Sequence, residues 1–292
     1  MSELQKIKSK EVIMGVKSIV YSNDIQKRLS DMLDTRASAF TSSIINLVAS
    51  NKDLQLCSSD TILKSAMVAA SLNLSIDPNL GQAAIVPYNS KNSDTKVAQF
   101  QMMWRGFVQL AIRSGVYERL NATKVYADEV ERYDPFTARL VTTPPDKWNQ
   151  RRAGEDDKVV GYYAYFKLNE RGGNFEMSIY MTKEDVENHA KKYSQAYRSD
   201  KKYKSSKSIW TTDFDTMGEK TVLKRLLSRY GVLSVDMEKA IAYDQAVIKS
   251  EGADEVEFEY IDNTQEENFG KLDNPFKEVE QTDINDIFPE SE

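Results

Sequence analysis

The sequence predicts an α+β fold that contains antiparallel strand pairs, joined by short turns, and a long helix. Two pairs of short, largely apolar segments are each separated by a polar turn, 82–88 with 96–103 and 158–168 with 175–181. Such pairs are typical of β-hairpins. The third observation is the segment 213–230, where apolar residues recur at helical spacing. Hairpins combined with helices that follow them indicate the α+β class.

The chain is expected to begin with a small helical region. Residues 1–12 are predicted to be a frayed terminus. Apolar residues then fall at helical spacing in the segments 19–33, 38–48 and 61–74. Core packing is the favoured role for these apolar stripes, and a subunit interface is the alternative.

The first predicted hairpin leads directly into a short basic helix. Its loop, 89–95, is rich in Asn, Ser and Asp, which favour turns. The helix is expected over 105–114, and Gly115 ends it as a residue that readily takes left-handed geometry. The corner aromatic and the polar stripe of this helix are Trp104, Arg105, Gln109 and Arg113. Cations can follow phosphates and aromatics can stack on bases, so the unit suits nucleic acid, whereas an ordinary solvated helix is the alternative.

The middle of the chain contains further strands and a basic segment. A strand is expected over 121–130, and 133–157 reads as a long connection. A helix is expected from Thr182, because Asp185 completes a capping box there. The segment 196–209 is predicted to be a mobile loop that either clamps phosphates or is merely solvated. Its candidate contacts are Arg198, Lys201 and Lys202.

The predicted helix at 213–230 carries an unbalanced charge. On a helical wheel, one half holds the apolar residues Val222, Leu223, Leu226, Leu227 and Tyr230, and the cations fall in the other half. These cations are Lys220, Lys224, Arg225 and Arg229. After Glu219 no acidic residue of the helix lies among them, whereas an ordinary surface helix alternates the signs. The pattern therefore favours a phosphate-contacting surface, with a plain solvated face as the alternative.

Charge is segregated along the 292 residues, although the formal net charge is only −6. Residues 237–292 contain 17 acidic and 4 basic side chains, and the preceding 236 residues contain 28 acidic and 35 basic ones. A basic body with an acidic tail points to nucleic acid or to an interaction tail. We expect a core domain at 13–249, with a helical N-terminal lobe, and a disordered tail at 250–292, where apolar residues are few.

The sequence carries little that resembles an enzyme. It has no G-x-x-x-x-G-K-[ST] loop, and its lone His189 and lone Cys57 cannot form a His/Cys metal set. We expect His189 to be a solvated surface residue. The adjacent acids Asp128 and Glu129 could hold Mg²⁺ in a nuclease, but such pairs are frequent at this composition. A single cysteine and the lack of any apolar run of membrane-spanning length predict a cytoplasmic protein without a membrane segment.

Three blocks of this sequence resemble the RecT family of phage single-strand annealing proteins, in order and spacing over roughly residues 15–245. The block around the predicted helix at 105–114 consists of Gln99, Phe100, Gln101, Trp104, Arg105, Gly106, Phe107, Leu110, Ala111, Arg113, Ser114 and Gly115. An earlier block includes Ser65, Ala66, Leu72, Asp77, Gly81, Pro87 and Tyr88. A later block includes Trp210, Asp213, Met217, Lys220, Thr221, Arg225, Gly231 and Asp236. At the corner, Trp104 stands where the family more often has Tyr.

The resemblance implies a Rad52-like annealing core, in which a β-hairpin and an antiparallel sheet are backed by a long helix. It also implies a function that needs no ATP. It implies annealing of complementary single strands in phage homologous recombination, in the cytoplasm of a bacterial host. The expected partners are single-stranded DNA and the annealed duplex, further copies of the chain in a ring or helical filament, a phage exonuclease and a host single-strand binding protein. No cofactor is expected beyond Mg²⁺ as a DNA counterion. A passive single-strand binding or replication accessory protein is the alternative.

From the split charge and the missing nucleotide site we hypothesise one DNA-binding channel. In it, cations from two separate segments hold phosphates while aromatic and amide side chains shape the groove. Its predicted residues are Tyr88, Gln99, Gln101, Trp104, Arg105, Phe107, Arg113, Arg198, Lys201, Lys202, Lys220, Lys224, Arg225 and Arg229. No catalytic residue is predicted.

Overall fold

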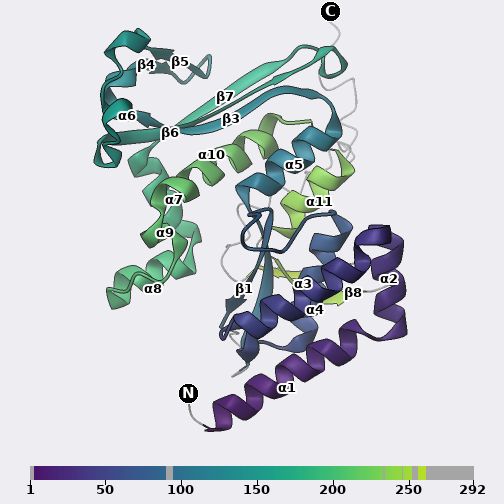
Figure 1. Ribbon diagram of the computed structural model, residues 1–292. Helices are drawn as coiled ribbons and strands as arrows, with labels where there is room; N and C mark the ends of the chain where they lie inside the picture. Colours follow the sequence, from purple (N-terminus) through teal and green to yellow (C-terminus); the bar gives the residue numbers. More distant parts are fainter. Residues whose placement is uncertain (1–2, 90–94, 233, 245, 252–255, 261–292) are drawn as a thin grey trace, which may run out of the picture.

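The computed structural model describes residues 3–89, 95–232, 234–244, 246–251 and 256–260, and it has the predicted α+β class. Helices α1–α4 gather at one end around a β-hairpin, and a three-stranded sheet lies at the other end (Figure 1). Helices α5 and α10 lie between these two parts. All of the paired strands within these ranges are antiparallel, apart from an isolated parallel bridge between Cys57 and Lys96.

Four helices form the N-terminal part. They are α1 (Glu3–Val20), α2 (Asn23–Leu33), α3 (Ala37–Ser50) and α4 (Ser59–Ser71). Helix α1 starts at Glu3, within the segment predicted to be frayed. Apolar residues on the inner faces of these helices, such as Leu29, Ile44 and Ile62, are fully buried. Their burial agrees with the favoured role of core packing.

The first hairpin and its helix form as predicted. Strand β1 (Ala83–Tyr88) pairs with β2 (Val97–Met102), and α5 (Trp104–Ser114) follows at once. Gly115 ends α5 with a φ of +68°, in the left-handed region that glycine adopts without steric cost. A side chain at Gly106 would meet the Gln82 carbonyl oxygen at 2.2 Å, so only glycine lets α5 pack this closely against the start of the hairpin.

The main sheet has the strand order β3–β6–β7. Its strands are β3 (Tyr117–Tyr126), β6 (Val159–Leu168) and β7 (Glu176–Thr182). Strand β3 therefore starts and ends four residues before the strand predicted at 121–130. The predicted connection at 133–157 contains structure of its own, because β4 (Val130–Asp134) pairs with β5 (Arg139–Thr142) and the short helix α6 (Gln150–Ala153) follows.

Helix α10 (Phe214–Tyr230) packs across this sheet through its apolar half, as the wheel predicts. The capping box at Thr182 and Asp185 is confirmed, and it starts α7 (Lys183–Tyr193). The predicted loop at 196–209 is instead largely helical, with α8 (Gln195–Tyr203) and then α9 (Ile209–Thr212). The reason is Asp200, whose carboxylate accepts hydrogen bonds from the Lys207 and Ser208 amides and from the Ser205 and Thr211 hydroxyls.

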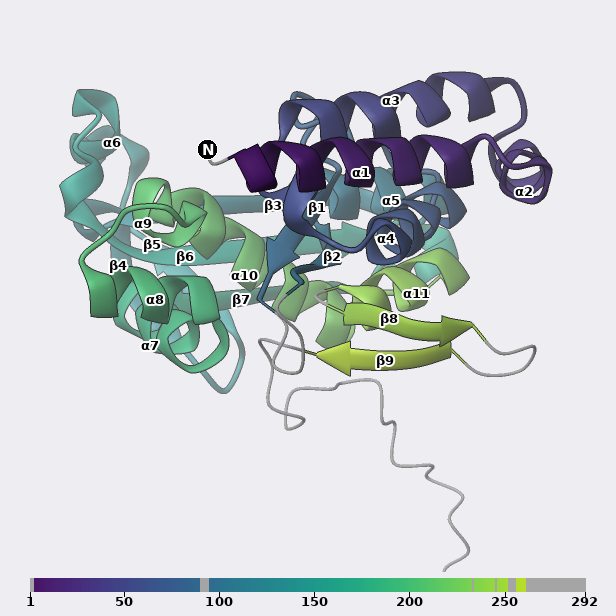
Figure 2. The same cartoon turned by 90° about the horizontal axis from the view of Figure 1, so that it is seen from below.

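The last described elements pack against the first hairpin. Helix α11 (Val235–Tyr243) comes first, and β8 (Ala246–Glu251) then pairs with β9 (Val256–Tyr260). Figure 2 shows the β8–β9 hairpin beside β2, which it contacts. Strand β9 lies within the range predicted to be a disordered tail, and residues 261–292 of that tail lie outside the described residues. Among the described helices, none combines the length and the apolar character needed to cross a bilayer.

Candidate nucleic-acid interface

The hairpin and α5 expose some of the predicted DNA-binding residues. Trp104 is 36% exposed at the corner, and Arg105 is exposed beside it. Tyr88 and Gln101 are half-buried on neighbouring strands, and the Gln101 amide donates a hydrogen bond of 2.8 Å to the Tyr88 hydroxyl. This bond fixes both side chains on one face of the hairpin.

Two residues of the predicted groove lie in the core. Gln99 and Phe107 each have 0% of their surface exposed. Phe107 belongs to the apolar side of α5. Gln99 lies on the face of β2 opposite to Ala98 and Phe100, and all three residues are buried. Their burial corrects the prediction that they shape an exposed groove, because neither side chain reaches the surface.

Two of the predicted phosphate-binding arginines bond to the ends of helices instead. The Arg113 guanidinium donates to the Leu72 carbonyl oxygen at 2.8 Å, just past the end of α4. Arg198 donates to the carbonyl oxygens of Lys191 and Lys192, at 3.2 and 2.6 Å, in the last turn of α7. Such carbonyls have no partner within their own helix, and a cation there also complements the helix dipole. Lys201 and Lys202 remain exposed on α8, next to tyrosine rings.

The lysines of α10 meet an acid that the helix itself does not contain. Lys224 Nζ lies 2.6 Å from Asp244 Oδ2, and Lys220 Nζ lies 4.0 Å from Asp244 Oδ1. The same Oδ1 accepts a 2.8 Å hydrogen bond from the Met102 amide at the end of β2. Lys220 is 5% exposed and Asp244 is 1% exposed. The prediction that these cations form an unpaired outer face is therefore wrong for Lys220 and Lys224.

Burial and charge act against each other in this cluster. Burial lowers the pKa of Lys220, although Asp244 acts to raise it. Burial alone would raise the pKa of Asp244, but Lys220, Lys224 and the Met102 amide together bring it below its ordinary value. Asp244 is accordingly ionised at neutral pH, and it joins the end of β2 to α10 through charged hydrogen bonds.

The arginines of α10 point elsewhere, into a pocket of about 600 Å³. We call this the arginine pocket. Arg225, Arg229 and Lys192 supply its positive charge, and Asp185 is its acidic residue. Its aromatic residues are Tyr133, Tyr180, Tyr193, Tyr230 and His189. Among the described residues, neither Arg225 nor Arg229 forms an ion pair with a carboxylate, so both guanidinium groups can bind an anion.

The arginine pocket is built from the β4–β5 hairpin, β7, α7 and α10. The first hairpin and α5 contribute none of its lining residues, so Arg105 and Arg113 are not brought into it. That both segments form one channel stays a prediction, because the lining of this pocket does not test it. The cations of α10 divide into an inner pair, which contacts Asp244, and an outer pair, which lines the pocket with tyrosines.

Comparison with known proteins agrees with a nucleic-acid interface. A model of the RecT family matches residues 38–261. The chain belongs to the RecT family. Protein YqaK of Bacillus subtilis (strain 168), described as uncharacterized, is 39% identical over 226 residues, covering 77% of this chain and 70% of YqaK. Protein RecT of Escherichia coli (strain K12) is 27% identical over 218 residues, covering 72% of this chain and 74% of that protein. RecT-family proteins bind DNA and anneal single strands in recombination.

His189 lies in the wall of the arginine pocket of this RecT-family chain, not on the open surface as predicted. It is half-buried, with its ring centroid 4.8 Å from that of Tyr193 and 6.5 Å from that of Trp210. Burial, followed by the charges of Lys224, Arg225 and Lys192, lowers the pKa of His189 to about 4. The imidazole is therefore neutral at pH 7 and adds no charge to the pocket.

A test of this environment is the pH dependence of stability. In the unfolded chain His189 should titrate near 6.5, so as the pH falls from 6.5 towards 4 only the unfolded state binds the proton. The free energy of unfolding should fall over that window by on the order of 2 kcal/mol through this group. Urea unfolding at pH 7 and pH 4.5 should show a smaller loss for His189→Gln than for the unchanged protein. Equal losses in the two proteins would contradict the assigned environment.

The pocket residues that the sequence did not reveal are Tyr133, Tyr180, Tyr193 and Lys192. They come from β4, β7 and α7, and only tertiary packing brings these three elements together. One signal was present, since Lys191, Lys192 and Tyr193 end a capped helix with two cations and an aromatic. Nothing local indicates that this end faces Arg225.

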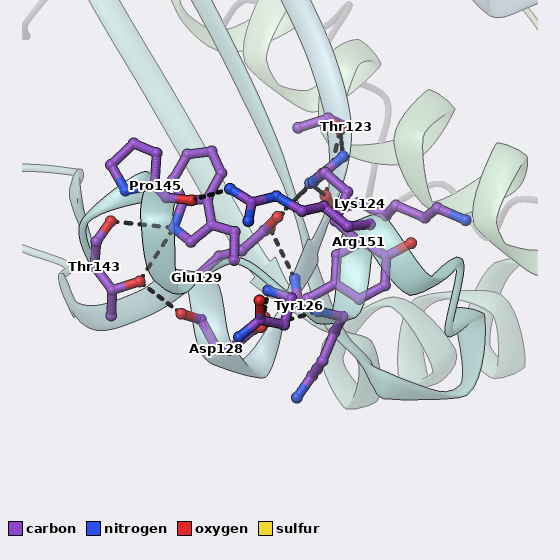
Figure 3. Close-up of polar contacts among 12 residues, drawn as sticks. Thr123, Lys124, Tyr126, Asp128, Glu129, Thr143, Pro145 and Arg151 are labelled. Carbon is purple, nitrogen blue, oxygen red and sulfur yellow. Dashed lines mark hydrogen bonds and ion pairs between the residues drawn. The ribbon is translucent and has the colours of Figure 1, made fainter.

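The carboxylates weighed as a magnesium site are bonded within the RecT-family fold itself. Asp128 accepts hydrogen bonds from the Asn149 and Gln150 amides, at 2.7 and 3.0 Å. Glu129 pairs with Arg151 and accepts a 3.1 Å bond from the Tyr126 amide (Figure 3). These contacts hold α6 against the end of β3. Within the described part of the chain, no group of three or more His, Cys, Asp or Glu residues is placed to hold a metal ion.

Proposed function

We propose that this protein binds single-stranded DNA and anneals complementary strands without ATP, in homologous recombination of phage origin. The observation that carries the proposal is the arginine pocket, where Arg225 and Arg229 lie among four tyrosines without a carboxylate partner in the described residues. Guanidinium groups bind phosphates in a forked geometry, and tyrosine faces accept bases of any sequence. Membership of the RecT family supports the same activity.

In the proposed mechanism the protein binds the strand through its sugar-phosphate backbone. If Arg225, Arg229 and Lys192 hold phosphates, the base edges of the strand stay open to a second strand. Correct pairing then selects the partner, and the protein needs no base-specific contacts. Trp104 and Arg105, which are exposed at the first hairpin, are proposed as a second contact with the same strand or with its complement. We propose no catalytic residue and no cofactor, with Mg²⁺ only as a counterion of the DNA.

Assembly is part of the proposal. Two single strands repel each other, and an array of subunits screens that repulsion over many phosphates better than one subunit does. We propose a Rad52-like annealing core that assembles into a ring or helical filament. The proposed protein partners are a phage exonuclease, which would supply single strands, and a host single-strand binding protein.

The test is an annealing assay with two complementary labelled oligonucleotides, without ATP. Pairing should be faster with the protein than without it, and a non-complementary pair should stay single-stranded. The alternative, a passive single-strand binding protein, would slow the pairing. Electrophoresis of the same samples, with and without a magnesium chelator, would reveal cleavage if the protein were a nuclease. Slower pairing or cleavage would overturn the proposal.

A further inference from the structure

The β4–β5 hairpin presents an aromatic side chain to solvent at its tip. Phe136 is 97% exposed, and Met14, at 70%, is the next most exposed large apolar side chain of the described residues. No other large apolar residue of the hairpin is exposed. Neighbouring Thr137 and Arg139 are polar and exposed. Phe136 is therefore a single aromatic group in polar surroundings rather than part of an apolar patch.

The tip that holds Phe136 is fixed by hydrogen bonds. Asp134 Oδ1 accepts a bond of 3.0 Å from the Phe136 amide, and Asp134 Oδ2 accepts one of 2.8 Å from the Thr137 hydroxyl. Aspartate commonly orders a turn in this way. Ala138 follows with a φ of +54°, which returns the chain into β5. An exposed ring on an ordered turn loses little further backbone entropy when it binds a partner.

The hairpin is also fixed to the main sheet. The Ser178 hydroxyl of β7 donates to the Ala138 carbonyl oxygen at 2.5 Å. The Tyr133 and Tyr180 rings have centroids 5.3 Å apart. Residues on both sides of the tip, Pro135 and Ala138, line the arginine pocket. Phe136 is thus held at the rim of the pocket that contains Arg225 and Arg229.

We propose that Phe136 stacks on a base of the single strand whose phosphates lie on Arg225 and Arg229. This inference rests on the proposed function and adds to it the site of a base contact. A nucleobase is the occupant that the surroundings favour, because a polar, cationic rim complements a polyanion while one ring supplies the stacking surface. A protein partner would more often be bound through a larger apolar core of several residues. Stacking on one base after another would not depend on sequence.

The first experiment measures the affinity of the full chain for a labelled oligothymidylate by fluorescence anisotropy. Phe136→Ala and Phe136→Leu should each weaken binding by about fivefold or more, as expected for the loss of base–aromatic stacking. Phe136→Tyr keeps an aromatic face and should bind as the unchanged protein does. Tyr21→Ala removes another aromatic residue, 61% exposed and far along the chain in the N-terminal part, and should have no effect. Since Phe136 packs against nothing, circular dichroism should be the same for all variants.

The second experiment locates the contact directly. An oligonucleotide containing 5-iodouracil, irradiated in the complex, should cross-link to the peptide that contains Phe136. Unchanged affinity of Phe136→Ala, or retained affinity of Phe136→Leu, would overturn the inference. So would dissociation of a DNA-free oligomer by Phe136→Ala in sedimentation, because the ring would then bind a second copy. If the unchanged protein bound no single strand, both the proposed function and this inference would fail. If the Phe136 variants bound and annealed DNA as well as the unchanged protein, only the inference would be overturned.

Discussion

Asp244→Asn is expected to lower the free energy of unfolding by about 3–5 kcal/mol, the usual cost of leaving a buried charge without its partner. Asn can still accept the hydrogen bond from the Met102 amide, but it cannot compensate the charges of Lys220 and Lys224. The uncompensated charge of Lys220 would cost more than that of Lys224, because Lys220 is only 5% exposed and water cannot solvate its ammonium group. Urea unfolding at pH 7 measures the effect, and the midpoint should move clearly to lower urea.

Two further variants separate charge from packing. Lys220→Met in the Asp244→Asn background removes the uncompensated charge and should recover part of the lost stability. Asp60→Asn breaks the pair with Lys64 on α4, where the carboxylate is 62% exposed, and should cost less than about 1 kcal/mol. An Asp244→Asn protein as stable as the Asp60→Asn control would show that the buried cluster has no such role.

Arg225→Ala combined with Arg229→Ala is expected to weaken binding of single-stranded DNA by roughly tenfold for each guanidinium group lost. If both groups contact phosphates, the slope of log affinity against log salt should also become shallower, by about 1.4. Anisotropy titrations between about 50 and 300 mM salt, over which the Debye length falls from above to below about 10 Å, measure both quantities. Annealing rates should fall in parallel.

The matched control removes two arginines from the main sheet. Arg119 on β3 and Arg171 at the turn between β6 and β7 are both outside the arginine pocket, and Arg119→Ala with Arg171→Ala removes the same amount of charge. This control should keep the salt slope of the unchanged protein. An identical slope in both double variants would show that Arg225 and Arg229 contribute only to the general charge. Charge reversal at Lys224 is not a suitable test of DNA binding, because it would place a second carboxylate against buried Asp244.

The elements that were predicted from the sequence depend on neighbours along the chain. The first hairpin follows from two short apolar segments around a polar loop, Gly115 from left-handed geometry, and the start of α7 from Thr182 and Asp185, three residues apart. Each of these signals is complete within a few residues, so its outcome does not depend on tertiary contacts. The resemblance to RecT proteins rested on the same local blocks, and the family match confirms it.

The features that were missed depend on residues far apart in sequence. Asp200 turns a basic segment into helix and ordered turn, because its carboxylate is buried among donors that composition does not reveal. Lys220 and Lys224 looked unpaired because their acid lies at position 244, outside the helix. Gln99 looked like a surface amide on an alternating strand, yet β2 is covered on more than one side. The periodicity of apolar residues indicates which side chains share a face of a helix or strand. It does not indicate whether solvent or another element of the chain covers that face.

The bond between Met102 and Asp244 joins residues 142 positions apart. During synthesis on a ribosome, β2 and α10 would therefore wait until Asp244 emerges before their shared carboxylate is present. Until then Lys220 has no buried counter-charge, and a nascent chain, or a product of premature termination, would carry an uncompensated ammonium group at the centre of the molecule. Completion of the native state is thus expected late in translation.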